Sequence, residues 1–105
     1  MYIYSVTLHI DKIAEREWLN FMQEKHIADV LAAGYFHSCS MRKLVTTEEK
    51  GSSTYQMQYT MDSEEKYEGY QKNAAPLLQA DVSKRFQGKY TAERDFFKII
   101  SETSV

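Results

Sequence analysis

The chain has 105 residues, with 13 basic and 15 acidic side chains, a hydrophobic content of 43% and one cysteine. This length predicts one domain, residues 1–105, with a single hydrophobic core. The charge balance disfavours a nucleic-acid partner, and no apolar run is long enough to span a membrane. The lone cysteine and the lack of a signal-peptide pattern at the N-terminus predict a cytoplasmic protein.

The first half of the chain predicts a strand, a long helix and a second strand. Residues 2–10 alternate between apolar and polar positions, as a strand does. Asp11 is expected to cap the following helix, which Gly34 ends. Residues 35–45 alternate without a clean apolar face, which indicates an edge strand or a strand covered by a partner.

The second half repeats this order. A polar loop over 46–53 precedes the strand 54–61, and Asp62 or Ser63 is expected to cap the next helix. Pro76 predicts a break in that helix near 73–75, followed by a second helical piece to Phe86. Residues 89–100 predict a last strand before a frayed tail.

The order βαββαβ predicts a ferredoxin-like α+β fold. Its four-stranded antiparallel sheet has the order 4-1-3-2 when the crossovers are right-handed, with both helices on one face. The uncovered face is then either exposed to solvent or packed against a second copy in a two-fold dimer. The apolar Ile3 on that face, with the mixed faces of the second and fourth strands, favours a homodimer.

One candidate site follows from the helical spacing of Trp18, Met22 and His26, which share one face of the first helix. His26 either faces a cavity, as an acid, base or hydrogen-bond donor, or marks a helix break, where it caps local carbonyls or lies half exposed. Arg94 either binds a carboxylate or phosphate or pairs with its neighbours Glu93 and Asp95 across the sheet or a dimer.

Other kinds of site are disfavoured. Phosphate-loop, dinucleotide-binding, zinc-protease and serine-hydrolase motifs are absent from the sequence. The three histidines are not expected to converge, so a metal site is not predicted. No cofactor is predicted either. Tyrosines in the strands resemble an RNA-stacking platform, but they alternate in step with Val6 and Leu8, which favours a place in the core.

Several short motifs together resemble a small bacterial family of uncharacterised proteins in the dimeric α/β-barrel, ferredoxin-like clan. The motifs are Met1-Tyr-Ile-Tyr, Trp18 with Met22, His26-Ile27, Asp29 to Ala32 with Gly34, Thr54-Tyr55, Gln58-Tyr59, Arg85-Phe86, Gly88-Lys89, and Ala92 with Arg94. Ala28 stands where members of that family commonly have proline, so the first helix is expected to break less sharply. The resemblance implies a homodimer and no assigned activity, although the clan contains antibiotic-biosynthesis monooxygenases and haem-degrading enzymes.

These observations predict a homodimer that binds a small apolar or aromatic ligand between the first helix and the sheet. The walls and polar anchors of this pocket are expected to be Trp18, Met22, Tyr4, Tyr59, His26 and Arg94. Two alternatives remain open at this point. One is a cofactor-independent monooxygenase or isomerase with His26 as base, and the other is a structural or regulatory dimer without a ligand.

Overall fold

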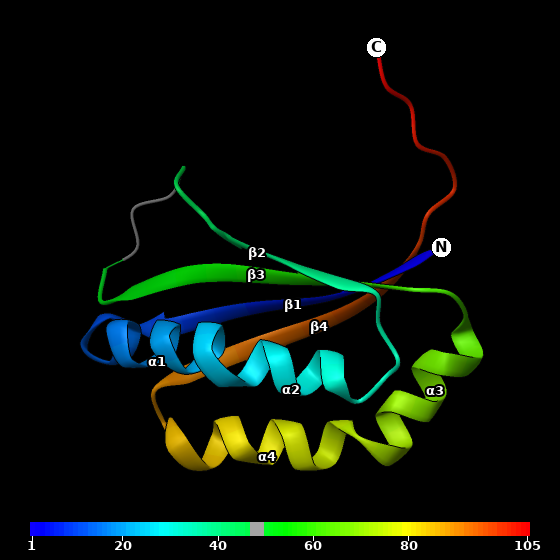
Figure 1. Cartoon of the computed structure of the whole chain (residues 1–105). Coiled ribbons are helices and arrows are strands. Elements are labelled where there is room, and N and C mark those ends of the chain that lie inside the picture. Colours follow the sequence, from blue (N-terminus) through cyan, green and yellow to red (C-terminus); the bar gives the residue numbers. More distant parts are fainter. Residues whose placement is uncertain (47–49) are drawn as a thin grey trace.

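The computed structural model describes residues 1–46 and 50–105, which form four strands with helical segments on one side (Figure 1). Residues 47–49, in the expected loop 46–53, lie outside the described residues. The elements in chain order are β1 (Tyr2–Asp11), the 3-10 turn η1 (Lys12–Ala14), α1 (Glu15–Phe21), the π-helical turn η2 (Met22–His26), α2 (Ile27–Ala32), β2 (Ser38–Lys43), β3 (Ser52–Met61), α3 (Glu64–Asn73), α4 (Ala75–Arg85) and β4 (Tyr90–Lys98).

The sheet has the order β2-β3-β1-β4 with every neighbouring pair antiparallel, which confirms the ferredoxin-like prediction. Tyr4 lies opposite Tyr59 on one side and opposite Phe96 on the other. Because side chains alternate along a strand, the even-numbered residues of β1 face the helices and its odd-numbered residues face away. Tyr4, Leu8 and Ile10 are accordingly almost fully buried.

The first helical region differs from the prediction at both its start and its middle. Asp11 is the last residue of β1, and its side chain makes no capping hydrogen bond, so the predicted cap is wrong. The helix then runs from Glu15 through Ala28 without a break. Its irregularity lies earlier, in η2, where the Ile27 N–H donates to the Met22 carbonyl, five residues back. A π-helical turn of this kind takes in one extra residue while the helix continues.

The second helical region follows the prediction closely. The Ser63 Oγ accepts a hydrogen bond from the Lys66 backbone N–H at 3.1 Å, which caps α3. The helix breaks at Ala74, between α3 and α4, as the sequence predicts. Pro76 lies in the first turn of α4, where backbone N–H groups have no intrahelical partner, so the N–H that proline lacks is not needed there. Gly88, at φ +74°, allows the chain to turn into β4.

The strand boundaries are shifted by two or three residues in places. β2 begins only at Ser38, because residues 35–37 connect it to the helix and Tyr35 and Phe36 pack their rings against Tyr70. β3 begins at Ser52, two residues before the predicted start, and its first residues extend the pairing with β1 as far as Asp11.

Aromatic side chains fill much of the space between sheet and helices. Tyr4 packs within 6.0 Å of four other rings, which belong to Phe36, Tyr59, Tyr67 and Tyr70. Offset and tilted aromatic pairs of this kind stabilise a core beyond the burial of their area. The strand tyrosines Tyr4, Tyr55 and Tyr59 are therefore core residues, as their alternation predicts.

The other face of the sheet carries no helix within the described residues (Figure 1). Its side chains are mostly polar, with Ile3 opposite Phe97 as an apolar pair. Among the described residues, no helix is long and apolar enough to cross a bilayer.

Candidate functional site

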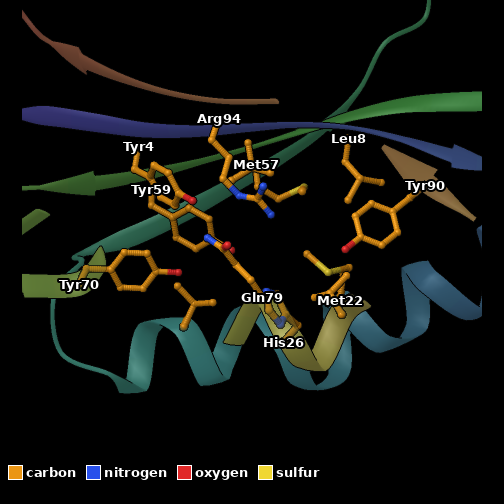
Figure 2. Close-up of a pocket in the computed structure, with 13 residues that line it drawn as sticks. Tyr4, Leu8, Met22, His26, Met57, Tyr59, Tyr70, Gln79, Tyr90 and Arg94 are labelled. Carbon is orange, nitrogen blue, oxygen red and sulfur yellow. The ribbon is translucent and has the colours of Figure 1, made fainter. Parts of the chain in front are cut away.

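A small cavity of about 40 Å³ lies between the sheet and the helices, near the middle of the buried face (Figure 2). Strands β1, β3 and β4 line it from the sheet side, and η2, α2, α3 and α4 line it from the helix side. Met22, Met57, Val6 and Leu8 make it largely apolar, while His26, Gln79 and Arg94 contribute polar groups. A mainly apolar hollow with a few convergent polar groups is typical of a ligand site.

Five of the six residues predicted for the site line this cavity. They are Tyr4, Met22, His26, Tyr59 and Arg94. Trp18 does not line it, although its side chain is fully buried. Its ring packs against that of Tyr55, with centroids 4.9 Å apart. Trp18 lies one turn before η2, so it covers the sheet beside the cavity and not the cavity itself.

His26, the last residue of η2, lines the cavity and is buried, with 9% of its surface exposed. Its Nδ1 has no hydrogen-bond partner among the described residues. Burial lowers the pKa of His26, and the carboxylates of Asp81 and Asp29 offset this only in part. The imidazole is therefore neutral near pH 7, with one ring nitrogen unsatisfied. A buried polar atom without a partner is uncommon and costs free energy.

Arg94 reaches toward the cavity from the edge strand β4 (Figure 2). It lies opposite Val6, on the face of the sheet that the helices cover. Glu93 and Asp95 point to the other face because side chains alternate along a strand. No ion pair of Arg94 occurs in residues 1–46 and 50–105, so the predicted pairing with these two neighbours is not seen within the chain.

Three phenols at the cavity, those of Tyr4, Tyr59 and Tyr70, are neutral. Burial raises the pKa of Tyr59 and of Tyr70 far above the ordinary value for tyrosine, and it also raises the pKa of Tyr4. The nearby Arg94 guanidinium lowers the pKa of Tyr4, but burial has the larger effect. The residues that line the cavity include no aspartate or glutamate. The formal charge of the lining thus comes from Arg94.

A second, larger groove of about 340 Å³ runs between α4 and β4. It shares Gln79, Tyr90 and Arg94 with the inner cavity, so these three side chains form the boundary between the two spaces. The sequence indicates that Tyr90 lies on the same face of the sheet as Arg94, because the two residues are an even number of positions apart in one strand. The sequence contains no such indication for Gln79, a polar residue between apolar positions of α4.

A separate cluster around Glu15 has no signal in the sequence. The Glu15 carboxylate accepts hydrogen bonds from the Tyr55 hydroxyl, from Ser53 Oγ at 2.9 Å and from Lys43 Nζ at 3.1 Å. The bond from Tyr55 is the main reason that the pKa of Glu15 is lowered. None of these residues lines the cavity, and the cluster ties the start of α1 to β2 and β3.

The other two histidines lie elsewhere. His9 Nδ1 lies 2.7 Å from Thr54 Oγ1 on the uncovered face of the sheet, and His37 contacts Asp62 at the end of β3. In the part of the chain that the structure describes, no group of three or more His, Cys, Asp or Glu side chains is arranged to hold a metal ion.

Residues 1–100 match a protein family described as a domain of unknown function, DUF4286. The chain belongs to the DUF4286 family. No curated protein matches the sequence. The assignment covers all the strands and helices described above, and it agrees with the resemblance to an uncharacterised ferredoxin-like family.

Solved structures share the fold of this DUF4286 protein. A dimeric ferredoxin-like protein from an uncultured marine organism is 14% identical, with both chains covered in full and a TM-score of 0.69. The haem-degrader MhuD of Mycobacterium tuberculosis, solved with two haems bound, is 16% identical over 99% of this chain and 100% of its own, with a TM-score of 0.72. SnoaB, a cofactor-independent oxygenase from Streptomyces nogalater, is 13% identical over 96% and 95%, with a TM-score of 0.62. At these identities the similarity concerns the fold alone.

Proposed function

We propose that this protein binds a small, largely apolar molecule in the cavity between η2, α4 and the sheet. The observation that carries the proposal is that His26 lines the cavity and that its buried Nδ1 has no hydrogen-bond partner among residues 1–46 and 50–105. A ligand or a bound water would satisfy this atom and remove the cost of leaving it unpaired. The apolar walls would supply the rest of the binding free energy.

The size of the cavity limits the ligand. A water needs roughly 10–15 Å³ of such space, and a buried cavity that binds benzene measures about 150 Å³. The volume of about 40 Å³ therefore suits a short aliphatic chain of a few heavy atoms better than an aromatic ring. Haem, which the relative MhuD binds, is far larger than this cavity.

The methionines offer a direct test of cavity binding. Met22 and Met57 line the cavity, whereas Met41 and Met61 do not. Titration with butyramide, an uncharged four-carbon probe, should shift the ¹³C-methyl NMR signals of Met22 and Met57 saturably. The signals of Met41 and Met61 serve as internal controls and should stay in place. If the signals of Met22 and Met57 do not move with butyramide or any other short aliphatic probe, the proposed function is wrong.

The proposed functional unit is a homodimer that packs the uncovered faces of two sheets together. The apolar pair Ile3 and Phe97 lies on that face, and Phe97 is 52% exposed. The face also carries Arg42 on β2 at one edge and Glu93 on β4 at the other. In a two-fold arrangement, opposite charges at opposite edges can meet across the interface.

Light scattering tests this assembly. The wild-type protein should have the mass of two chains at micromolar concentration, and Phe97→Glu should shift it to one chain. Ile100→Glu is the matched control, because Ile100 is 84% exposed but follows the end of β4. A monomeric wild type, or equal effects of the two variants, would refute the proposed interface.

A second candidate function is proton abstraction from the bound molecule by His26. The lowered pKa of His26 favours it, because the neutral imidazole is the form that acts as a base. The test is exchange of the C3 protons of 2-oxobutyrate for deuterium in D₂O, followed by NMR. His26→Gln should abolish the exchange above the solvent background. Exchange that persists in this variant would exclude His26 as the base.

A further inference from the structure

We infer that the ligand is a short-chain carboxylate whose acid group lies against Arg94 and whose aliphatic chain enters the cavity toward Met22 and Met57. This inference rests on the proposed binding function of the cavity and adds the chemical class of the ligand. It is carried by the charge of the lining, by the position of Arg94 at the boundary of two spaces, and by the size of the inner one.

The first argument is the unbalanced charge of Arg94. Lys25, Lys43, Lys66 and Arg85 each have a carboxylate oxygen within 3.5 Å. Arg94 has no such partner among the described residues, which is also true of Arg16, but Arg94 lines the cavity and the lining includes no acid. A guanidinium is planar and presents parallel N–H donors that match the two oxygens of a carboxylate. An anionic ligand would supply the missing counter-charge.

The second argument concerns the neutral groups beside Arg94. The phenols of Tyr4, Tyr59 and Tyr70 stay protonated because burial raises the pKa of each. They therefore add no negative charge beside a bound anion, although the Tyr59 hydroxyl is already hydrogen-bonded to Cys39. The side-chain amide of Gln79 also faces this space and can donate to a carboxylate oxygen. The polar lining is therefore compatible with an acid and offers no anionic partner to a cationic ligand.

The third argument fixes the orientation of the ligand. Arg94 is exposed on the groove side, yet it also lines the inner cavity. An acid group held here keeps contact with water, so it avoids the large free-energy cost of burying an ion. The chain then occupies the inner cavity, where Met22, Met57, Val6 and Leu8 provide apolar contacts. The volume of about 40 Å³ admits about three carbons beyond the acid group.

Three probes of equal length and different charge test the inference: butyrate, butyramide and butylammonium. Binding is measured at pH 7 from the methyl signals of Met22 and Met57. Butyrate should bind at least about tenfold more tightly than butyramide, because hydrogen bonds to charged groups are stronger than neutral ones. Butylammonium should bind most weakly, because Arg94 repels it.

Variants separate this inference from the proposed function. Arg94→Gln should abolish the preference for butyrate over butyramide, whereas Arg94→Lys should retain part of that preference. Arg16→Gln is the control, because Arg16 is exposed on α1 and does not line the cavity.

Each outcome has a distinct meaning. Equal binding of butyrate and butyramide to the wild type, or a butyrate preference that survives Arg94→Gln, would overturn the carboxylate assignment while the cavity remains a binding site. A lack of response to all three probes would overturn the proposed function and this inference together.

Discussion

The hydroxyl of Tyr90 lies 2.8 Å from the Oγ of Ser83, so a hydrogen bond joins the first residue of β4 to α4. Tyr90 belongs to the boundary between the cavity and the outer groove. Ser83 lines the groove but not the cavity. The bond therefore holds the Tyr90 ring in place between the groove and the cavity, on the entry path that the proposed ligand would take.

Loss of this bond should speed ligand exchange. We expect Tyr90→Phe and Ser83→Ala to increase the association and dissociation rates of butyrate by similar factors, with little change in affinity. NMR line shapes of the Met22 methyl signal measure both rates. Because the bond is exposed, each variant should lower the free energy of unfolding by only about 0.5–1 kcal/mol. The double variant should change the exchange rates and the free energy of unfolding little more than either single variant does. Additive effects of the two substitutions would contradict a shared bond.

His26 should make the stability of the protein depend on pH. Its folded-state pKa is lowered by burial, so the unfolded chain takes up a proton more readily than the folded protein. The contribution of the neutral imidazole is present above about pH 6.5 and is lost as the pH falls through the lowered pKa. Urea unfolding should show this loss in the wild type and a smaller loss in His26→Gln. His37→Gln is the control, because its side chain is exposed, and it should retain the loss.

Glu15 should contribute stability in a different pH range. Its pKa is lowered, chiefly by the hydrogen bond from Tyr55, so its contribution is present above about pH 4.5 and is lost as the pH falls through the lowered value. We expect Glu15→Gln to reduce the free energy of unfolding at pH 7 by about 1–3 kcal/mol. The difference from the wild type should shrink toward pH 3. Glu17→Gln is the control, because Glu17 is exposed on the same helix. It should change the free energy of unfolding little at either pH.

A larger cavity should change the preferred length of the ligand. Met22→Ala removes a side chain from the wall and should cost about 2–5 kcal/mol of stability. It should also shift the binding preference from butyrate toward hexanoate, measured through the Met57 methyl signal. Met61→Ala is the matched control, because Met61 is fully buried but does not line the cavity. Equal shifts of preference in both variants would contradict the assigned walls.

Local patterns in the sequence predict most of this fold. Alternation along residues 2–10 places the correct face of β1 under the helices, and Pro76 locates the break between α3 and α4. Helical spacing also identifies Met22 and His26 as residues of one buried face. These features depend on short-range geometry, which a single sequence contains.

The remaining features depend on contacts between distant segments. Glu15 gains its role from Tyr55, 40 residues later in the chain. Gln79 lines both the cavity and the groove between α4 and β4, which no periodicity in α4 indicates. Trp18 shares the helical face of Met22 but packs on Tyr55, because position along the helix axis, as well as direction, decides which residues reach the cavity.

The π-helical turn gives the chain one residue more than a regular helix needs at the wall of the cavity. Deleting Gln23 or Glu24 would convert the bond from Ile27 to Met22 into an ordinary α-helical one and leave both flanking helices in register. A change of chain length here would thus reshape the cavity before it disturbed the sheet. At this point of the fold, a change of one residue in chain length alters the wall of the cavity while the strands keep their register.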